Sequence, residues 1–344
     1  LSVPAGTLRL RATYRFEALV YMQQDPAINA TSKCSVYVQP QPLVAGLDGG
    51  VERIVGADAS LTLDASPSYD PDAVEGENAT LAYAWSCANV SATPATPCVD
   101  ASGAPLQPAL DAFGAANATV TLAAGTLAAG DGYEFSVRVS TDTRNASAAV
   151  HIIIIPGAPP ETTVGLGGLT PDAVVNQNDG DNPAYLALVG SAVGDARIAT
   201  SVWTLEDGGD MDASSPFAVA SDRLTTALAL ATMTVGVTYT FRLTVTDVQD
   251  NAAYGEVRVT INAPPSSGSC ALAPIKGWAL MSDYTFRCVN WVDDDLPLGY
   301  EFRAQPGGAT SRSPLADTQQ APSFTSLLPP GDSASSRTGL SRTD

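Results

Sequence analysis

Apolar and polar residues alternate along short stretches of the chain, and clusters of Gly, Pro, Asn and Asp separate these stretches. Strands with one buried face show this two-residue period, whereas the 3.6-residue period of an amphipathic helix is hard to find here. The chain has 29 Gly and 25 Pro among 344 residues, and only 7% of its residues are aromatic. We therefore predict an all-β fold made of many short strands.

One part of the pattern occurs three times. Residues 5–16 read AGTLRLRATYRF, residues 124–135 read AGTLAAGDGYEF, and a looser copy, TVGVTYTF, occupies 234–241. Each copy ends in Tyr-x-Phe and continues into an alternating strand. A further strand that opens with Asn-Ala is expected to follow, at Asn29, Asn145 and Asn251. A repeat of about 105–120 residues suits a seven-stranded, Ig-like β-sandwich.

The repeat predicts the domain organisation. Residues 39–157 and 158–263 each hold one full repeat and are expected to form complete sandwiches. Residues 1–38 hold only the Tyr-x-Phe half, so we expect them to be the C-terminal strands of a preceding module in a longer polypeptide. Residues 264–344 are expected to start a further module and to end in an irregular tail. Pro pairs do not fit a central strand and therefore mark short linkers between modules.

Aromatic residues of the repeat suit the cores of such modules. Tyr14, Tyr133 and Tyr239 stand where the strand-F tyrosine of an Ig-like sandwich caps a backbone corner with its hydroxyl. Trp85 and Trp203 fall upstream of these tyrosines, where strand C places a core tryptophan. We expect the two tryptophans to lie in separate cores.

The charge of the chain excludes one class of partner. Lys and Arg total 17 against 36 Asp and Glu, which gives a formal net charge of −19. Such a chain repels phosphate backbones, so we expect no nucleic-acid partner. No apolar run reaches the roughly 18–20 residues that span a membrane, so membrane association is expected only through regions outside this chain. The acidic charge indicates solubility first and attraction for divalent cations second.

Candidate catalytic groups are few. His151 is the single histidine and directly precedes the run IIII, where alternation predicts a half-buried strand residue. The sequence has no Gly-x-Ser-x-Gly turn to accompany it and no phosphate-binding loop of the GxxxxGK type. We predict a protein without enzymatic activity.

Four of the five cysteines are expected to form local disulfides. Cys87 and Cys98 bracket a short loop rich in Pro, Ser and Thr, and Cys270 and Cys288 stand close together in a later module. Each bridge would stabilise the fold by about 3 kcal/mol in the chain-entropy model. Spacing does not determine connectivity, so other pairings stay open, and Cys34 is left over.

Glycosylation sequons cluster in the first part of the chain. The motif Asn-x-Ser/Thr occurs at Asn29, Asn78, Asn89, Asn117 and Asn145. A single sequon is weak evidence, but five of them beside paired cysteines predict a secreted or surface-exposed glycoprotein.

Two stretches resemble a known family. Residues 49–87, GGVERIVGADASLTLDASPSYDPDAVEGENATLAYAWSC, resemble the PKD-like opening of receptor-for-egg-jelly (REJ) regions, which occur in polycystin-1-like proteins and sperm surface receptors. Residues 262–302 resemble the same region more specifically, with two Pro, a Gly/Ser stretch with Cys, a Gly-x-Ala-Leu turn, a second Cys, then Trp, acidic residues and Pro-Leu-x-Tyr-x-Phe. The resemblance implies tandem Ig-like sandwiches of the PKD/REJ type, extracellular and non-enzymatic. Residues 158–263 depart from it, since they lack the cysteine pair and the Asp-x-Asp turn.

Acidic residues recur in one turn of these modules. Asp70 and Asp72 occupy it in the first complete module, and Asp293, Asp294 and Asp295 occupy it in the last. Aspartate suits such turns because its carboxylate accepts backbone N–H bonds two residues on, and this structural role is our first interpretation. Calcium, which takes six to eight oxygen ligands, is the second, with Asp70, Asp72, Asp293 and Asp295 as ligands. A general acid–base pair ranks last, because no other catalytic feature accompanies it.

These features predict a structural or adhesive building block of a cell-surface assembly, including a ciliary or flagellar one. The alternative is a ligand- or force-sensing ectodomain of a polycystin-1-like receptor. No cofactor is expected to be required, with calcium as the one candidate. Partners are expected to be other extracellular modules, in the same or in other chains. Because all five sequons precede residue 150, we expect protein contacts mainly on the modules after residue 158.

Overall fold

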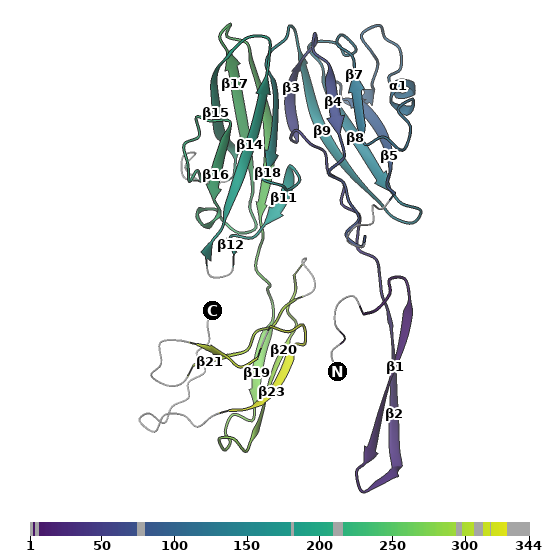
Figure 1. Ribbon diagram of the computed structural model, residues 1–344, viewed down its shortest axis with the longest axis vertical. Coiled ribbons are helices and arrows are strands. Elements are labelled where there is room, and N and C mark those ends of the chain that lie inside the picture. Colours follow the sequence, from purple (N-terminus) through teal and green to yellow (C-terminus); the bar gives the residue numbers. More distant parts are fainter. Residues whose placement is uncertain are drawn as a thin grey trace. The chain divides into compact units, whose positions relative to one another are not determined.

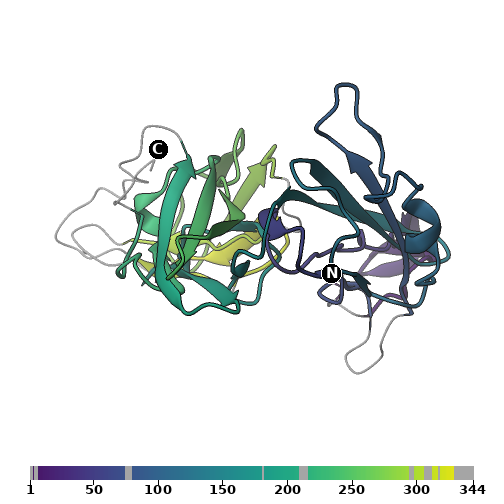
Figure 2. The same cartoon turned by 90° about the horizontal axis from the view of Figure 1, so that it is seen from above.

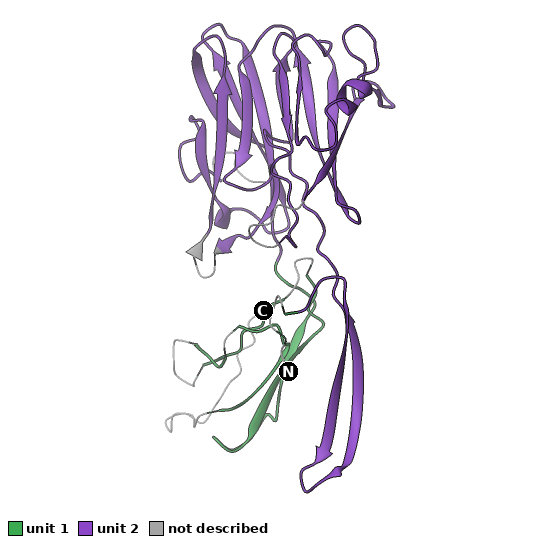
Figure 3. Ribbon diagram, turned by 45° about the vertical axis from the view of Figure 1, so that its right-hand side comes forward, with its two compact units in different colours: residues 1–7, 264–344 green, residues 8–263 purple. Residues whose placement is uncertain are grey.

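The regular secondary structure of the computed structural model is almost all β-strand, as the alternating pattern predicts. It separates into two compact units, one of residues 8–263 and one of residues 1–7 and 264–344 (Figure 3). In the described part of the chain, no helix is long and apolar enough to cross a membrane. The structure describes residues 3, 7–73, 80–179, 182–208, 216–293, 298–305, 312–316 and 318–328.

The first complete module of the larger unit is a two-layer sandwich (Figure 1). Its elements are β3 (Glu52–Gly56), β4 (Leu61–Asp64), β5 (Ala82–Asn89), β6 (Thr96–Pro97), α1 (Gln107–Asp111), β7 (Thr119–Leu122), β8 (Gly132–Ser140) and β9 (Asn145–Ile155). One layer pairs β4 with β7, and the other runs in the order β3-β9-β8-β5-β6. Strand β3 is parallel to β9, and the short helix α1 lies beside β5 (Figure 2).

The second module has the same plan. Its elements are β10 (Glu161–Leu166), β11 (Asp172–Val175), β12 (Asn178–Asp179), β13 (Asn182–Pro183), β14 (Tyr185–Val193), β15 (Ile198–Asp207), β16 (Thr225–Ala229), the 3-10 helix η1 (Leu230–Thr232), β17 (Thr238–Asp247) and β18 (Ala252–Ile261). One layer is β10-β14-β16 and the other is β15-β17-β18, with β11 parallel to the end of β18. Strands β8 and β17 thus hold equivalent places, as do β9 and β18.

Each module has its own hydrophobic core. Trp85 lies in the first core and Trp203 in the second, which confirms that the two tryptophans are buried separately. The Trp203 indole N–H donates to the Leu224 carbonyl at 3.0 Å, so its one polar group is satisfied inside the core. Along β8 and β17 every second side chain is buried, and these apolar positions set which face of each strand turns inward.

The repeated tyrosine caps a backbone corner in all three copies. Its hydroxyl accepts a hydrogen bond from the backbone N–H five positions upstream. The three pairs are Tyr14 with Arg9 at 2.7 Å, Tyr133 with Ala128 at 3.2 Å, and Tyr239 with Thr234 at 2.8 Å. The sequence repeat therefore corresponds to a structural repeat, with the tyrosine at the start of strand F each time.

A hairpin of β1 (Thr13–Met22) and β2 (Asp25–Tyr37) precedes the first complete module. It has the form of the β8–β9 and β17–β18 pairs, with Phe16 opposite Cys34 where those pairs set a core phenylalanine opposite a core valine. Our prediction that the second strand opens at Asn29 is wrong. A two-residue connection closes the hairpin directly, so pairing already begins at Asp25.

The smaller unit includes the residues from Pro264 onward. Its strands are β19 (Ser269–Ala273), β20 (Asp283–Val289), β21 (Arg303–Ala304), β22 (Ser313–Pro314) and β23 (Ser323–Leu327). Strands β19, β20 and β23 form an antiparallel sheet, and β21 pairs with β22. Phe286, Phe302 and Phe324 pack together, with ring centroids 5.6–6.2 Å apart.

We predict that Tyr133→Phe and Tyr239→Phe each lower the free energy of unfolding by about 1–2 kcal/mol. The reason is that the backbone N–H of Ala128 or Thr234 loses its acceptor within the fold. Tyr185→Phe is the matched control, since that side chain is 65% exposed. Denaturant unfolding of the three variants measures the difference, and equal stabilities for all three would show that the hydroxyls do not cap the corners.

Candidate functional site: the junction of the first two modules

The two complete modules share one sheet. Strand β18 of the second module pairs antiparallel with β3 of the first, with Glu256 opposite Glu52 and Gly255 opposite Arg53. The pairing joins the larger layers of both sandwiches in the order β15-β17-β18-β3-β9-β8-β5-β6, with β11 beside β18 (Figure 1). The predicted Pro-rich linker between β9 and β10 is therefore accompanied by a direct main-chain connection between the modules.

Main-chain contacts hold this junction, and a glycine makes them possible. The Val51 N–H donates to the Glu256 carbonyl at 2.7 Å, and the His151 N–H donates to the Val51 carbonyl at 2.9 Å. Gly50 has a φ of +105°, and a Cβ atom there would lie 2.6 Å from the Glu256 carbonyl oxygen and 2.7 Å from the Val164 side chain. Glycine alone suits both the backbone angle and the space.

A row of polar side chains crosses the face of the shared sheet that is turned away from the cores. His151 Nδ1 lies 2.7 Å from Glu52 Oε2, and the Tyr254 hydroxyl donates to Glu52 Oε1 at 2.7 Å. Arg242 Nε donates to Glu256 Oε1 at 2.7 Å, and its guanidinium carbon lies 4.1 Å from the centre of the Tyr254 ring. The row thus connects β9 and β3 of the first module with β18 and β17 of the second.

Burial and hydrogen bonding oppose each other within this row. Burial alone would raise the pKa of Glu52, but hydrogen bonds from His151 and Tyr254 bring that pKa below its ordinary value. Burial raises the pKa of Tyr254, and its hydrogen bond to Glu52 raises it further. Burial alone would lower the pKa of Arg242, but the ion pair with Glu256 raises it instead. At neutral pH, Glu52 and Arg242 are therefore charged and Tyr254 is neutral.

The opposite face of the junction holds a buried arginine. Arg53 is 3% exposed and donates from Nη2 to the Thr62 carbonyl at 2.7 Å. Burial lowers the pKa of Arg53, and the carboxylates of Glu161 and Asp48 act against this. Because Glu161 opens the first strand of the second module, Arg53 adds an electrostatic attraction between the modules to the main-chain pairing.

The predicted acidic turn of the first module holds an arginine. Arg144 Nη1 donates to Asp70 at 2.9 Å, to Asp72 at 2.9 Å and to the Gln41 carbonyl at 2.7 Å. The side chains are 16% exposed for Arg144, 8% for Asp70 and 6% for Asp72. Burial alone would raise the pKa of Asp70, but the hydrogen bonds from Arg144 lower it. A guanidinium thus lies between the two carboxylates predicted as calcium ligands, and calcium would have to displace it.

The acidic turn of the last module is described only in part. Asp293 belongs to the described residues, whereas Asp294 and Asp295 lie outside them. Over the described ranges of the chain, no group of three or more His, Cys, Asp and Glu side chains is placed to hold a metal ion. Calcium binding by this turn therefore stays a prediction.

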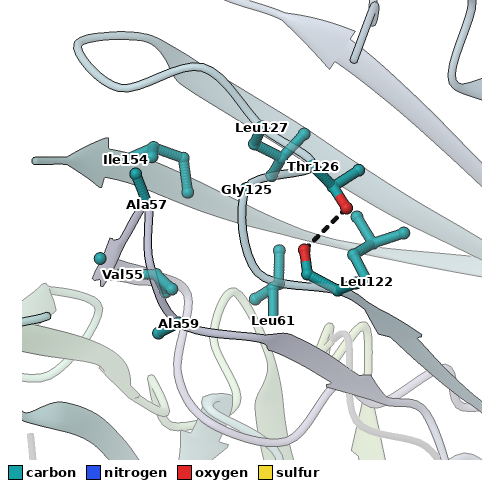
Figure 4. A pocket seen from close by; sticks show the side chains of 11 residues that line it. Val55, Ala57, Ala59, Leu61, Leu122, Gly125, Thr126, Leu127 and Ile154 are labelled. Carbon is teal, nitrogen blue, oxygen red and sulfur yellow. Dashed lines mark hydrogen bonds between the residues drawn. The ribbon is translucent and has the colours of Figure 1, made fainter. Parts of the chain in front are cut away.

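A small apolar cavity lies inside the first module (Figure 4). Its volume of about 10 Å³ is room for one water molecule at most. The Thr126 hydroxyl beside it donates to the Ala123 carbonyl at 2.7 Å. The other side chains around it are aliphatic, among them Val55, Leu61, Leu122, Leu127 and Ile154. The cavity therefore offers a substrate neither room nor an acid–base pair.

The structure joins Cys87 to Cys98 and Cys270 to Cys288. The first bridge ties strand β5 to the following loop, with Cys98 buried in the core of the first module. The second bridge links directly opposite positions of β19 and β20. Cys34 is a free, exposed thiol in the structure.

The sequon asparagines differ in their surroundings. Asn29, Asn117 and Asn145 are exposed, the first in β2 and the last at the start of β9. Asn89 is half-buried, and its Nδ2 donates to Asp131 Oδ2 at 3.2 Å. Asn78 lies outside the described residues.

Sequence reasoning found His151 but missed its partners. It placed His151 in a half-buried strand, as the structure does, but it did not identify Glu52, Tyr254, Arg242 or Glu256. A signal was present, because charged residues stand at alternate positions of strands that are otherwise apolar. The missing information was which strand edges meet, since pairing between modules depends on their packing and leaves no local pattern.

We predict that Arg144→Ala destabilises the first module by about 3 kcal/mol, because it leaves the buried carboxylates of Asp70 and Asp72 without their cation. Arg138→Ala is the matched control, since Arg138 is exposed on the neighbouring strand β8. Thermal unfolding compares the variants. Equal losses for the two would mean that the acidic turn does not depend on Arg144, and calcium would become the better explanation of the aspartates.

Comparison with known proteins identifies the relatives of this chain. A family model described as the REJ domain matches residues 1–339. Polycystin-1 of Homo sapiens is 26% identical over 286 residues, which cover 80% of this chain and 6% of polycystin-1. The chain thus spans a small fraction of the length of that relative.

Two solved structures also match most of the chain, at low identity. Domains A168–A170 of titin match 84% of this chain and 88% of theirs, at 12% identity and a TM-score of 0.28. A structure from a 1.5-MDa bacterial ice-binding adhesin matches 83% of this chain and 87% of its own, at 12% identity and a TM-score of 0.27. Similarity at this level adds nothing to the strand order described above. The REJ model, in contrast, matches nearly the whole sequence, and the chain therefore belongs to the REJ domain family.

Proposed function

We propose that this chain is a non-enzymatic segment of an extracellular glycoprotein and serves as a structural or adhesive building block of a cell-surface assembly. A ciliary or flagellar surface is the setting we propose for it. The observation that carries the proposal is the sheet shared by the first two modules. Main-chain pairing across a module boundary holds the orientation of one module against the other, which a Pro-containing linker alone does not do.

The chemistry of the chain supports an extracellular setting. Disulfides persist in oxidising compartments, and the structure contains two of them. Three of the sequons present an exposed asparagine, at Asn29, Asn117 and Asn145. The relationship to polycystin-1 agrees with an extracellular region of a larger protein.

We propose that the partners are other extracellular modules and that they contact this chain mainly after residue 158. Glycans on the sequons would cover the hairpin β1–β2 and the first complete module, because all five sequons lie there. Calcium would offset part of the repulsion between chains of this acidity, as a screening ion more than as a ligand of Asp70 and Asp72.

The second candidate function is a force- or ligand-sensing ectodomain of a polycystin-1-like receptor. The family relationship favours it, since this chain aligns with a 6% part of a much larger protein. Both candidates use a stiff pair of modules. A sensor additionally requires that load or ligand change the junction, whereas a building block requires that the junction stay closed.

We predict that Gly50→Ala uncouples the first two modules. An added Cβ would meet the Glu256 carbonyl oxygen and the Val164 side chain, so β3 and β18 would move apart. Scanning calorimetry of the full chain should show one joint transition for the two modules in the wild type and two separate transitions in the variant.

Gly103→Ala is the control for this variant. Gly103 has a similar φ of +87°, but an added Cβ there meets nothing within 4 Å. Both substitutions therefore bring a backbone strain of about 1–2 kcal/mol, and only Gly50→Ala adds a clash at the junction. If both variants keep one joint transition, the coupling of the modules does not depend on the close approach at Gly50.

We predict N-linked glycans in native material, with high occupancy at Asn145 and the lowest occupancy among the described sequons at Asn89. The Asn89 amide is half-buried and already donates to Asp131, whereas Asn145 is exposed. Mass spectrometry of glycopeptides measures occupancy at each site. Unmodified asparagine at every sequon would contradict the extracellular assignment.

A further inference from the structure

We propose that the pairing of His151 with Glu52 makes the junction of the first two modules sensitive to pH, closing it more tightly in mildly acid solution than at neutral or alkaline pH. This inference rests on the proposed function, because it assigns a regulator to the same junction. The structural basis is the position of the one histidine of the chain, on the strand next to the strand that crosses between the modules.

His151 acts on the junction through both its backbone and its side chain. Its N–H donates to the Val51 carbonyl at 2.9 Å, and the Val51 N–H donates across the boundary to the Glu256 carbonyl at 2.7 Å. Its ring Nδ1 lies 2.7 Å from Glu52 Oε2, and Glu52 is opposite Glu256 in the register. A change in the charge of the ring therefore acts on Glu52, the residue of β3 that lies opposite Glu256 of β18.

The charges around His151 are mostly negative. Glu134 stands opposite it on β8, and Glu52 stands opposite it on β3. Beyond Glu52, strand β18 presents Glu256 and the phenol of Tyr254, and Arg242 on β17 binds Glu256. Arg242 also pairs with Glu206 at 3.2 Å, so one arginine serves two carboxylates. A positive charge on His151, in addition to that of Arg242, would reduce the repulsion among the carboxylates that meet at the boundary.

The direction of the effect follows from the two titrating groups. Histidine is the side chain whose charge ordinarily changes between pH 5 and 8, and a protonated ring would place a cation 2.7 Å from the Glu52 carboxylate. The pKa of Glu52 is held below its ordinary value, so this carboxylate stays ionised until more strongly acid solution. The ion pair therefore exists only in the pH range in which Glu52 has lost its proton and the ring still holds its own. Above that window only the hydrogen bond between a neutral ring and the charged carboxylate remains.

The effect should be moderate, because the His151 and Glu52 side chains are 34% and 24% exposed. Ion pairs with partial solvent access contribute a few-fold to an equilibrium. We expect the junction to open about two- to five-fold more often near pH 7.5 than near pH 5.5.

Hydrogen exchange at the Val51 amide tests the proposal in the full chain. This amide donates across the boundary, so its protection reports opening of the junction once the intrinsic pH dependence of exchange has been corrected. His151→Gln and Glu52→Gln should each abolish the pH dependence. Tyr254→Phe is the control, because it removes the hydrogen bond that Tyr254 donates to Glu52 but leaves both His151 and Glu52 in place. This variant should keep the pH dependence.

The outcomes separate this inference from the function on which it rests. Protection of Val51 that changes with pH in the wild type and not in His151→Gln supports the proposal. Protection that is equal at both pH values, or that changes equally in His151→Gln, overturns the pH sensitivity and leaves the closed junction intact. A Val51 amide without protection at either pH would overturn the closed junction itself.

Discussion

The pairing of β3 with β18 is the interaction on which the rest of the structure depends. One edge of β18 is divided between two partners, since β11 of its own module covers residues 258–261 and β3 of the first module covers residues 255 and 256. An exposed sheet edge offers unpaired N–H and C=O groups to any neighbouring strand. In this chain the two edges satisfy each other, so the boundary between the modules is closed by the backbone itself.

Side-chain contacts add to the main-chain pairing between the two modules. Gly50 allows the close approach, the charge of Glu161 attracts Arg53 on one side of the sheet, and the row from His151 to Arg242 crosses the other side. At the acidic turn of the first module, Arg144 ties Asp70 and Asp72 to the incoming chain at Gln41. Both connections of this module to the chain around it are therefore held by specific contacts, which suits the proposed structural role.

Much of the fold was predictable from the sequence, because the strand period and the tyrosine corner are local. The repeated AGTL and Tyr-x-Phe motifs locate the strand-F tyrosines, and the alternating runs locate the buried faces of β8 and β17. The junction was not predictable, since its parts lie about 200 residues apart, as Glu52 and Tyr254 do. The partner of Asp70 and Asp72 was missed for the same reason, because Arg144 reaches them from the turn between β8 and β9.

Residual dipolar couplings of backbone amides test the central claim most directly. If the shared sheet holds the first two modules as one body, a single alignment tensor will fit the couplings from both the β8–β9 and the β17–β18 strands. Each module supplies enough regular strand to determine a tensor separately, so the comparison is internal to one sample. Two tensors of clearly different magnitude would show that the modules move independently and that the β3–β18 pairing does not hold them together.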